Sequence, residues 1–531
     1  AADVDNSGNI TIGDLIQLRR LILSVITEFE NNTSWRFVDA TYAFPVPTNP
    51  WTEQFPEVVN VNNLEEDALI NGDFIEGLQP DHRTPEPDMI TEERAVALVM
   101  AELFAFGRHT VTQLLMVLGQ TEQDWSAWYR LLSQGRFVYE DISAILFRET
   151  LAHVGPDELY VVAGDGTQTP RSSRKMEGAA WMRNMRTPPF MVGIHAAQRW
   201  FNGSWLVPEE NGYSRAIPLR WLPAFTEKSQ PQTVEPLKEW EASVQFLTWL
   251  RQQFVAHERA EQAILFVGDG HYDNLELWQH LPDDVTMLAR SARNRVLYEL
   301  PNEMMHGNRK YGQRAATPQQ IWQTNRRWQY LELPVRGRTR HLQVCVRGPF
   351  VRKGAPHTPL FLIAVRGKQH KNKYGRTYRR QPLPFLVNAI QSVTGQWQLP
   401  LPLETLLFWA WQRWEVEVCH RELKTTFGLG HKQCFNPKAA VLSVQWSAWV
   451  YSLLLLAGYR TFGLARAPNV PTRWWRGSGR WSFATLLRSF RAALWGQHLF
   501  RPIFSPTQHD WVAKQGYLAA LKNTIYASMR S

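Results

Sequence analysis

The stretches Leu159-Tyr-Val-Val-Ala-Gly-Asp165 and Ile264-Leu-Phe-Val-Gly-Asp269 share one pattern, a short apolar run that ends in an aspartate. Apolar runs of this length are typical of buried β-strands. Each aspartate alone is weak evidence for a site, because aspartates are common in the turns that follow strands. If the two strands are neighbours in one sheet, however, they deliver both carboxylates to the same place. The pattern therefore predicts an α/β domain with Asp165 and Asp269 at the C-terminal ends of two adjacent strands.

A third carboxylate lies in the segment 409–424, whose pattern predicts one continuous helix. At about 100° per residue, Arg413, Glu417 and Lys424 share one helix face, whereas the other glutamates of the segment point elsewhere. Glu417 is thus flanked by cations one turn before it and two turns after it. A surface helix with ordinary ion pairs would show the same spacing, so this pattern gains its weight from the two aspartates that precede it.

Together the three elements resemble the DDE transposases of bacterial insertion sequences, in the insertion-sequence-four-like group. That family carries one aspartate after each of two strands and a glutamate on a later helix, within a Tyr-x2-Arg-x3-Glu-x6-Lys signature. Arg413, Glu417 and Lys424 keep this spacing in full, whereas Ala410 occupies the tyrosine position. The resemblance covers roughly residues 90–460.

The resemblance implies an α/β fold with an RNase H-like core, a mixed sheet flanked by helices, interrupted by a β-rich insertion. It implies that Asp165, Asp269 and Glu417 are the catalytic residues and bind Mg²⁺ or Mn²⁺, and that Arg413 and Lys424 bind DNA phosphates. Hard cations prefer carboxylate oxygens, and a pair of them can activate a water or 3′-hydroxyl and stabilise the leaving oxygen. The expected activity is cutting and joining of double-stranded DNA at insertion-sequence ends by a homodimer in the bacterial cytoplasm, at the nucleoid.

The catalytic domain is expected over 153–465, with the β-rich insertion at about 296–400. Within it, YLELPVRG, RHLQVCVRG and PLFLIAVRG in 327–367 predict three strands. A cationic loop follows, which in a basic protein favours phosphate contacts, although a solvated surface is the simpler alternative. Its basic residues are Lys368, His370, Lys371, Lys373, Arg376, Arg379 and Arg380. Of these, Lys371, Lys373 and Arg376 are expected to bind DNA phosphates. Trp322 and Trp328 are candidates for stacking on a flipped base.

Charge divides the chain into two parts. Residues 1–90 hold 16 acidic and 4 basic side chains, a net charge of −12, whereas the remaining residues hold 54 basic and 33 acidic side chains, a net of +21. An asymmetry of this size indicates two modules with different partners, because only the basic part would attract a phosphate backbone.

The acidic part begins with the pattern of a twelve-residue calcium loop, with Gly8 at the sharp turn. The expected Ca²⁺ ligands are Asp3, Asp5, Ser7, Asn9, Thr11 and Asp14. An Asx-rich turn that caps a helix is the alternative. The loop and the apolar helix after it resemble one repeat of a dockerin, the calcium-binding module that docks onto cohesins. No second loop follows in 1–77, which argues against cohesin binding, and 78–90 is expected to be a linker.

Helical patterns flank the catalytic domain. Residues 91–152 predict a helical domain, with DNA binding and plain helical packing equally favoured, and 466–531 predicts a basic, aromatic, helical tail. The uncharged stretch 439–459 is long enough to span a bilayer, but its serines and glutamine favour a buried core helix, and no membrane association is expected. Three cysteines exclude a disulfide framework and make structural zinc a poor interpretation.

Two other functions compete with the transposase interpretation. A secreted, dockerin-bearing carbohydrate hydrolase would use two carboxylates as acid and base and the many tryptophans as sugar platforms. The basic charge and the Arg413-x3-Glu417-x6-Lys424 spacing count against it. A catalytically dead DNA-binding relic is the second alternative, and the three carboxylates count against decay at the site.

Overall fold

The computed structural model describes residues 89–120, 125–184, 187, 191–301, 310–371, 375–468 and 480–495. These residues fall into two compact units, one built from the chain before residue 150 and after residue 426, the other from 150–426. The dockerin-like segment 1–77, and with it all six expected calcium ligands, lies outside the described residues.

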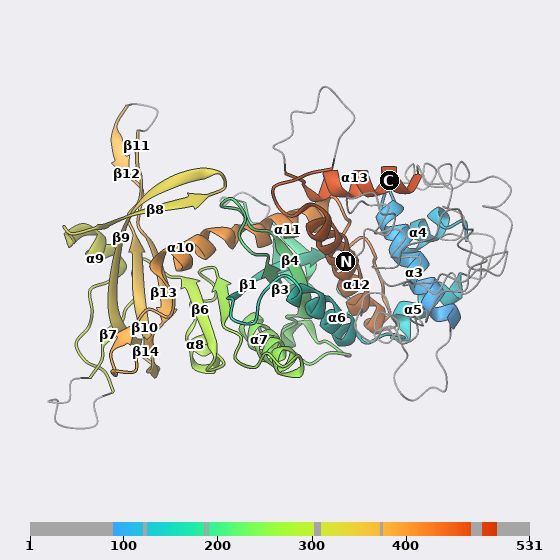
Figure 1. Ribbon diagram of the computed structural model, residues 1–531. Helices are drawn as coiled ribbons and strands as arrows, with labels where there is room; N and C mark the ends of the chain where they lie inside the picture. Colours follow the sequence, from blue (N-terminus) through green and yellow to red (C-terminus); the bar gives the residue numbers. More distant parts are fainter. Residues whose placement is uncertain are drawn as a thin grey trace, which may run out of the picture. The chain divides into compact units, whose positions relative to one another are not determined.

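The first unit is helical. Its helices are α3 (Met89–Phe104), α4 (Val111–Val117), α5 (Ser126–Ser133), α6 (Tyr139–Leu151), α12 (Pro437–Phe462) and α13 (Phe483–Trp495), shown in Figure 1. The sequence predicted helices in 91–152 and 439–459, where the structure has them; of the predicted helical tail 466–531, the described residues contain α13. Two buried contacts join the late segment to the early one: Trp449 Nε1 donates to the carbonyl of Ile142 over 2.9 Å, and Lys432 Nζ lies 2.7 Å from Glu102 Oε1.

Helix α12 contains the uncharged stretch 439–459. Asn436 caps its first turn by accepting from Ala439 N, and Pro437 follows at the first helical position. By length and composition this helix could cross a membrane, but 89% of its most apolar window is buried inside the protein. Its packing is that of a core helix, as the polar residues within the stretch predicted.

The second unit is built on one large mixed sheet (Figure 1). Its first half consists of β1 (Tyr160–Pro170), β2 (Ala180–Arg183), β3 (Ile194–Leu206), β4 (Ala216–Pro223), β5 (Ile264–Gly268) and β6 (Val285–Arg290). Strands β1, β5 and β6 are parallel, in that order, and β3 pairs antiparallel with β1 on the other side, with β4 antiparallel to β3. Three parallel strands beside an antiparallel pair are the RNase H-like arrangement, which confirms the expected fold class.

The sheet continues beyond β6 into the segment expected to be β-rich. Strand β13 (Leu383–Asn388) pairs with β6, then β10 (Ala355–Val365) and β9 (Arg338–Arg352) follow, all antiparallel. Strands β7 (Tyr298–Glu299) and β8 (Gln329–Val335) both pair with β9. The three strands predicted in 327–367 are β8, β9 and β10. Smaller elements complete this region: α9 (Pro318–Thr324) and the hairpins β11 (Gln369–Lys371)–β12 (Thr377–Arg379) and β14 (Ile390–Gln391)–β15 (Trp397–Gln398).

Helices cover both faces of the first half of the sheet. Helix α7 (Glu239–Ala256) packs on β3 and β4, and α11 (Trp414–Thr425) packs on β1 and β4. Helix α10 (Leu403–Gln412) packs on β5 and β6, and α8 (Leu275–His280) packs on β10. Neighbouring residues of β3 show that α7 and α11 lie on opposite faces, because Asn202 contacts α11 whereas a side chain at Gly203 would point at α7.

Gly203 marks the closest approach of α7 to the sheet. A Cβ atom at this position would lie 2.6 Å from the ring of Phe246, which is fully buried. We expect Gly203→Ala to destabilise the second unit by about 1–3 kcal/mol through overpacking. Urea unfolding measures this, with Gly155→Ala as the control, because a Cβ there meets its nearest atom at 3.4 Å. Equal unfolding midpoints for the two variants would contradict this packing.

Candidate active site

Asp165 lies in the middle of β1, not at its end as predicted. The strand continues to Pro170 because β3 pairs with it along its full second half, from Val162↔Trp205 to Pro170↔Ala197. The parallel pairing with β5, by contrast, stops at Ala163↔Val267. Asp165 therefore lies beyond the part of β1 that pairs with β5. The prediction was wrong about the end of β1, but Asp165 does follow the stretch that β1 shares with β5.

Asp269 directly follows β5, as predicted. Asp165 is the second residue after Ala163 and Asp269 the second after Val267, so both aspartates follow the last residue pair of the β1–β5 ladder at the same end of the two strands. A tight turn holds Asp269: its Oδ1 accepts from His271 N over 2.8 Å, and its carbonyl accepts from Tyr272 N over 3.2 Å. The structure thus brings the two predicted aspartates to the same place on neighbouring strands.

Glu417 reaches the aspartates from α11. The predicted single helix is interrupted, with α10 ending at Gln412 and α11 beginning at Trp414, and Arg413 forms the junction. The guanidinium of Arg413 lies between two carboxylates: Nη2 pairs with Glu417 Oε1, four residues on, and Nη1 is 3.8 Å from Asp165 Oδ2. Arg413 therefore links the helical carboxylate to the strand carboxylate.

The other glutamates of α11 are held by partners of their own. Glu415 is buried and accepts from Arg336 Nη2 over 2.9 Å. Glu422 pairs with Arg215. Both point away from Glu417, as the helical periodicity predicted, so Glu417 remains the only glutamate of α11 that shares a cation with Asp165.

Burial and like charge act together on Asp165. Desolvation is the main cause that raises its pKa to about 7, and the charges of Asp269, Glu417 and Glu239 raise it further, whereas Arg413 opposes them. Asp165 therefore senses the charge of both other predicted carboxylates. Crowded, incompletely neutralised carboxylates of this kind favour the binding of a cation.

A histidine that the sequence analysis missed completes the wall of the site. His420, one turn after Glu417, is buried, with Nδ1 3.9 Å from Asp165 Oδ2. Asn202 donates to His420 Nε2 over 3.1 Å, and Ser204 fixes that orientation by donating to Asn202 Oδ1. Burial lowers the pKa of His420 to about 3, so the ring is neutral and carries its proton on Nδ1, toward Asp165. Its i+3 spacing from Glu417 was the available signal.

The predicted phosphate ligands divide into two groups. Lys424 donates to Thr167 Oγ1 on β1, two residues beyond Asp165, so it and Arg413 border the site. Lys371 and Arg376 are exposed and belong to the β11–β12 hairpin, which lies well away from β1 and β5 in Figure 1. Lys373 lies outside the described residues. Trp322 and Trp328 are both half-buried, and Trp328 is covered by Arg366, whose Cζ is 5.4 Å from the ring centre.

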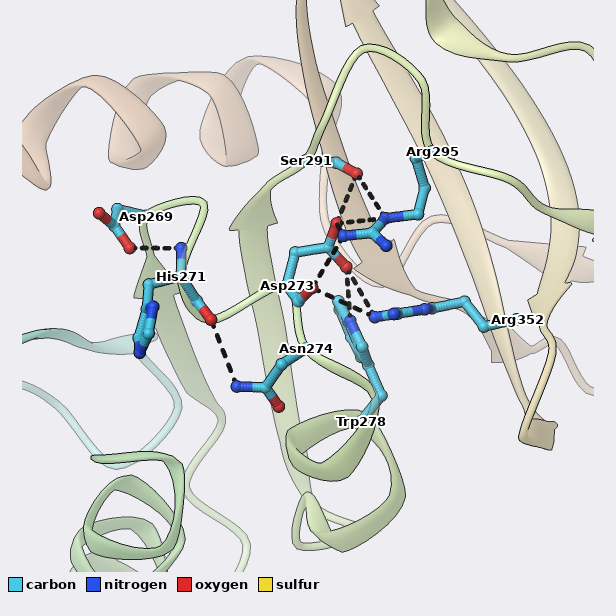
Figure 2. Close-up of polar contacts among 8 residues, drawn as sticks. All are labelled: Asp269, His271, Asp273, Asn274, Trp278, Ser291, Arg295 and Arg352. Carbon is cyan, nitrogen blue, oxygen red and sulfur yellow. Dashed lines mark hydrogen bonds and ion pairs between the residues drawn. The ribbon is translucent and has the colours of Figure 1, made fainter. Parts of the chain in front are cut away.

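The turn of Asp269 leads to a second aspartate with a different role. Figure 2 shows Asp273 at the centre of a polar network, buried completely and pointing away from Asp269. Its carboxylate accepts from Ser291 at 2.6 Å and from Trp278 Nε1 at 3.1 Å. Arg295 and Arg352 approach it to 2.6 and 2.9 Å. With both oxygens so fully paired, Asp273 is a structural anchor that joins the turn to β9 and to the loop after β6.

The donor set suits a hard divalent cation. Three carboxylates converge from β1, the β5 turn and α11, and their mutual repulsion is only partly offset by one arginine. Among the described residues, however, no three His, Cys, Asp or Glu side chains are gathered tightly enough to coordinate an ion. Arg413 stands between Asp165 and Glu417, so tight coordination by these two would require the guanidinium to move aside.

Removing the charge of Asp165 should stabilise the metal-free protein. The pKa of Asp165 is raised from its ordinary value of 3.8 to about 7 in the folded protein. The side chain is therefore neutral at low pH, and as the pH rises through 7 it becomes a charge that destabilises the folded state. Asp165→Asn should therefore raise the free energy of unfolding above pH 7 by up to about 4 kcal/mol, at 1.4 kcal/mol per unit, and have no effect near pH 4. Thermal unfolding in EDTA from pH 4 to 8 measures the difference, and a pH-independent difference would contradict it.

Asp273 should respond in the opposite way. Asp273→Asn leaves two arginines beside an uncharged amide in a buried setting, which should cost about 3–5 kcal/mol. Asp284→Asn is the control, because Asp284 is exposed and its Oδ2 is as far as 4.0 Å from Arg251 Nε. Loss of such a weak surface ion pair should cost under about 1 kcal/mol. Urea unfolding compares the two variants, and a mild effect at Asp273 would refute its anchoring role.

Comparisons with known proteins find similarity over part of the chain. Residues 87–344 match the family described as DDE superfamily endonuclease, a range that includes Asp165 and Asp269 and ends before Glu417. Among solved structures, the chain is similar to piggyBac transposase in a synaptic complex with hairpin DNA, with 9% sequence identity, 84% of this chain and 80% of that chain covered, and a TM-score of 0.34. No curated protein matches. Over residues 87–344, this chain is thus similar to the DDE superfamily endonucleases.

Proposed function

We propose that this protein is a DNA transposase of the insertion-sequence type, which cuts and joins phosphodiester bonds with the carboxylates of Asp165, Asp269 and Glu417. One observation carries the proposal: Asp165 of β1 lies near Asp269, which directly follows the adjacent parallel strand β5, and an arginine joins Asp165 to a glutamate on the covering helix. The similarity of residues 87–344 to DDE superfamily endonucleases supports the same chemistry.

The three carboxylates would hold Mg²⁺ or Mn²⁺. Bound there, the metal would activate the attacking water or 3′-hydroxyl and stabilise the leaving oxygen. Asp165 is placed to contribute most, because burial and the charges of both other carboxylates raise its pKa, and a bound cation would favour its ionised form. His420, neutral and buried, shields Asp165 from water on the side of α11 and adds no competing charge.

Cations at the rim would position the DNA. Arg413 can form paired hydrogen bonds with a phosphate once it leaves the carboxylates. Lys424 of α11 supplies a second positive charge beside Thr167, two residues after Asp165 on β1. Lys371 and Arg376 would contact the backbone farther from the cut site. The net charge of +21 over residues 91–531 provides the long-range attraction.

Joining two DNA ends requires two active sites, so we propose that the working complex contains at least a dimer on double-stranded DNA. Its substrate places it with the chromosome, in the cytoplasm at the nucleoid. The calcium loop at residues 3–14 would be a separate Ca²⁺ site in an acidic module that does not take part in catalysis.

Cleavage of DNA carrying the ends of the element that encodes the protein tests the proposal. In Mg²⁺, we expect Glu417→Gln to abolish strand cutting at those ends, a loss of at least about 100-fold, because a metal ligand is replaced by a neutral amide. Glu404→Gln is the matched control, since Glu404 is exposed on the preceding helix α10.

Three outcomes separate the alternatives. Cutting that is lost in Glu417→Gln and kept in Glu404→Gln supports the transposase and its third carboxylate together. Cutting that survives Glu417→Gln would transfer that role to another carboxylate, with Glu415 the first to replace. DNA binding without any metal-dependent cutting would favour a catalytically dead relic.

A further inference from the structure

A fourth carboxylate lies beneath the site, on the opposite face of the sheet from α11. Glu239 is the first residue of α7, and its side chain is 4% exposed. Oε2 accepts from Arg199 of β3, with Nε at 2.8 Å and Nη2 at 2.5 Å, and Oε1 accepts from the hydroxyl of Tyr272 at 3.0 Å. Both oxygens are therefore occupied by donors of the protein itself.

Tyr272 connects Glu239 to the turn that presents Asp269. Its backbone N–H closes that turn by donating to the carbonyl of Asp269, and its side chain is buried against Phe266 and Phe201. Burial and the neighbouring charge of Glu239 raise its pKa well above the ordinary value, so the hydroxyl keeps its proton and donates. The position of the turn thus depends on where the Glu239 carboxylate lies.

Glu239 also touches the strand that carries Asp165. A Cβ atom at Gly166 would lie 2.3 Å from Glu239 Oε2, so only glycine admits the carboxylate against β1 at this point. Asp165 is the preceding residue, and its side chain projects to the other face of the sheet. One buried carboxylate is therefore in contact with the backbone next to Asp165 and hydrogen-bonded to the turn of Asp269.

We infer that Glu239 is a positioning residue that sets the separation of Asp165 and Asp269 and thereby the affinity of the site for divalent metal. The inference rests on the proposed function, because it takes these aspartates as metal ligands. Glu239 is not assigned as a ligand itself, since Arg199 and Tyr272 occupy its oxygens. Groups that orient metal ligands in this way typically contribute 10–100-fold to metal affinity or activity.

Tyr272→Phe is the decisive variant, because it removes one hydrogen bond to Glu239 without changing any charge near the metal. We expect the dissociation constant for Mn²⁺, measured on the full chain without DNA by electron paramagnetic resonance, to rise by about 10-fold. The Mg²⁺ concentration for half-maximal DNA cutting should rise by a similar factor, with little change in the rate at saturating Mg²⁺. Glu239→Gln should weaken Mn²⁺ binding at least as much, because it also removes a negative charge.

Matched controls separate positioning from stability. Tyr160→Phe removes an equally buried hydroxyl of the same unit, which bonds Thr150 Oγ1 at 2.6 Å, and Glu241→Gln changes the same residue type two positions along α7. We expect both controls to bind Mn²⁺ like the wild type, even where Tyr160→Phe lowers the melting temperature as much as Tyr272→Phe does.

The outcomes also separate this inference from the proposed function. If the wild type binds Mn²⁺, Asp165→Asn abolishes binding, and Tyr272→Phe binds as weakly as expected, the inference is supported. If Tyr272→Phe matches Tyr160→Phe, Glu239 is only structural and the inference is overturned, while the proposed function stands. If the wild type neither binds Mn²⁺ nor cuts DNA, both fail together.

Discussion

The parallel pairing of β1 with β5 is the constraint on which the site depends. Its register brings Asp165 near Asp269, and every other group of the site is arranged around that pair. Because a shift of one residue would turn one of the two side chains to the opposite face, the register is as critical as the identity of the residues. The strands on either side, β3 and β6, extend the same hydrogen-bonded sheet and hold this register in place.

Asp273 and Asp165 show how the protein treats buried charge in two ways. Asp273 is neutralised by two arginines and satisfied by two further donors, so it stabilises the loop and is unsuited to bind anything else. Asp165 is partly buried, with 17% of its side chain exposed, but it has one distant arginine and several carboxylates as neighbours. The fold tolerates this repulsion at a place where a cation can relieve it.

The sequence predicted what depends on local pattern and missed what depends on long-range packing. Periodicity was sufficient for the strand before Asp269, and the i,i+4 spacing was sufficient for the pair of Arg413 with Glu417. The sequence pattern could not show that β1 runs past Asp165, because pairing with β3 extends that strand. Glu239 has no motif around it: it enters the site because α7 happens to begin beneath Gly166, which is a property of the assembled sheet.

The first unit is assembled from two ends of the chain, with 277 residues between them. During synthesis the second unit is therefore complete before α12 has left the ribosome, and it can fold as a contiguous piece. Until then Glu102, which ends buried against Lys432, has no counter-charge, and α6 lacks the helix whose Trp449 bonds its backbone. The helical unit thus cannot be completed until α12 has been synthesised, and a chain that stops before residue 437 would expose an unfinished helical surface.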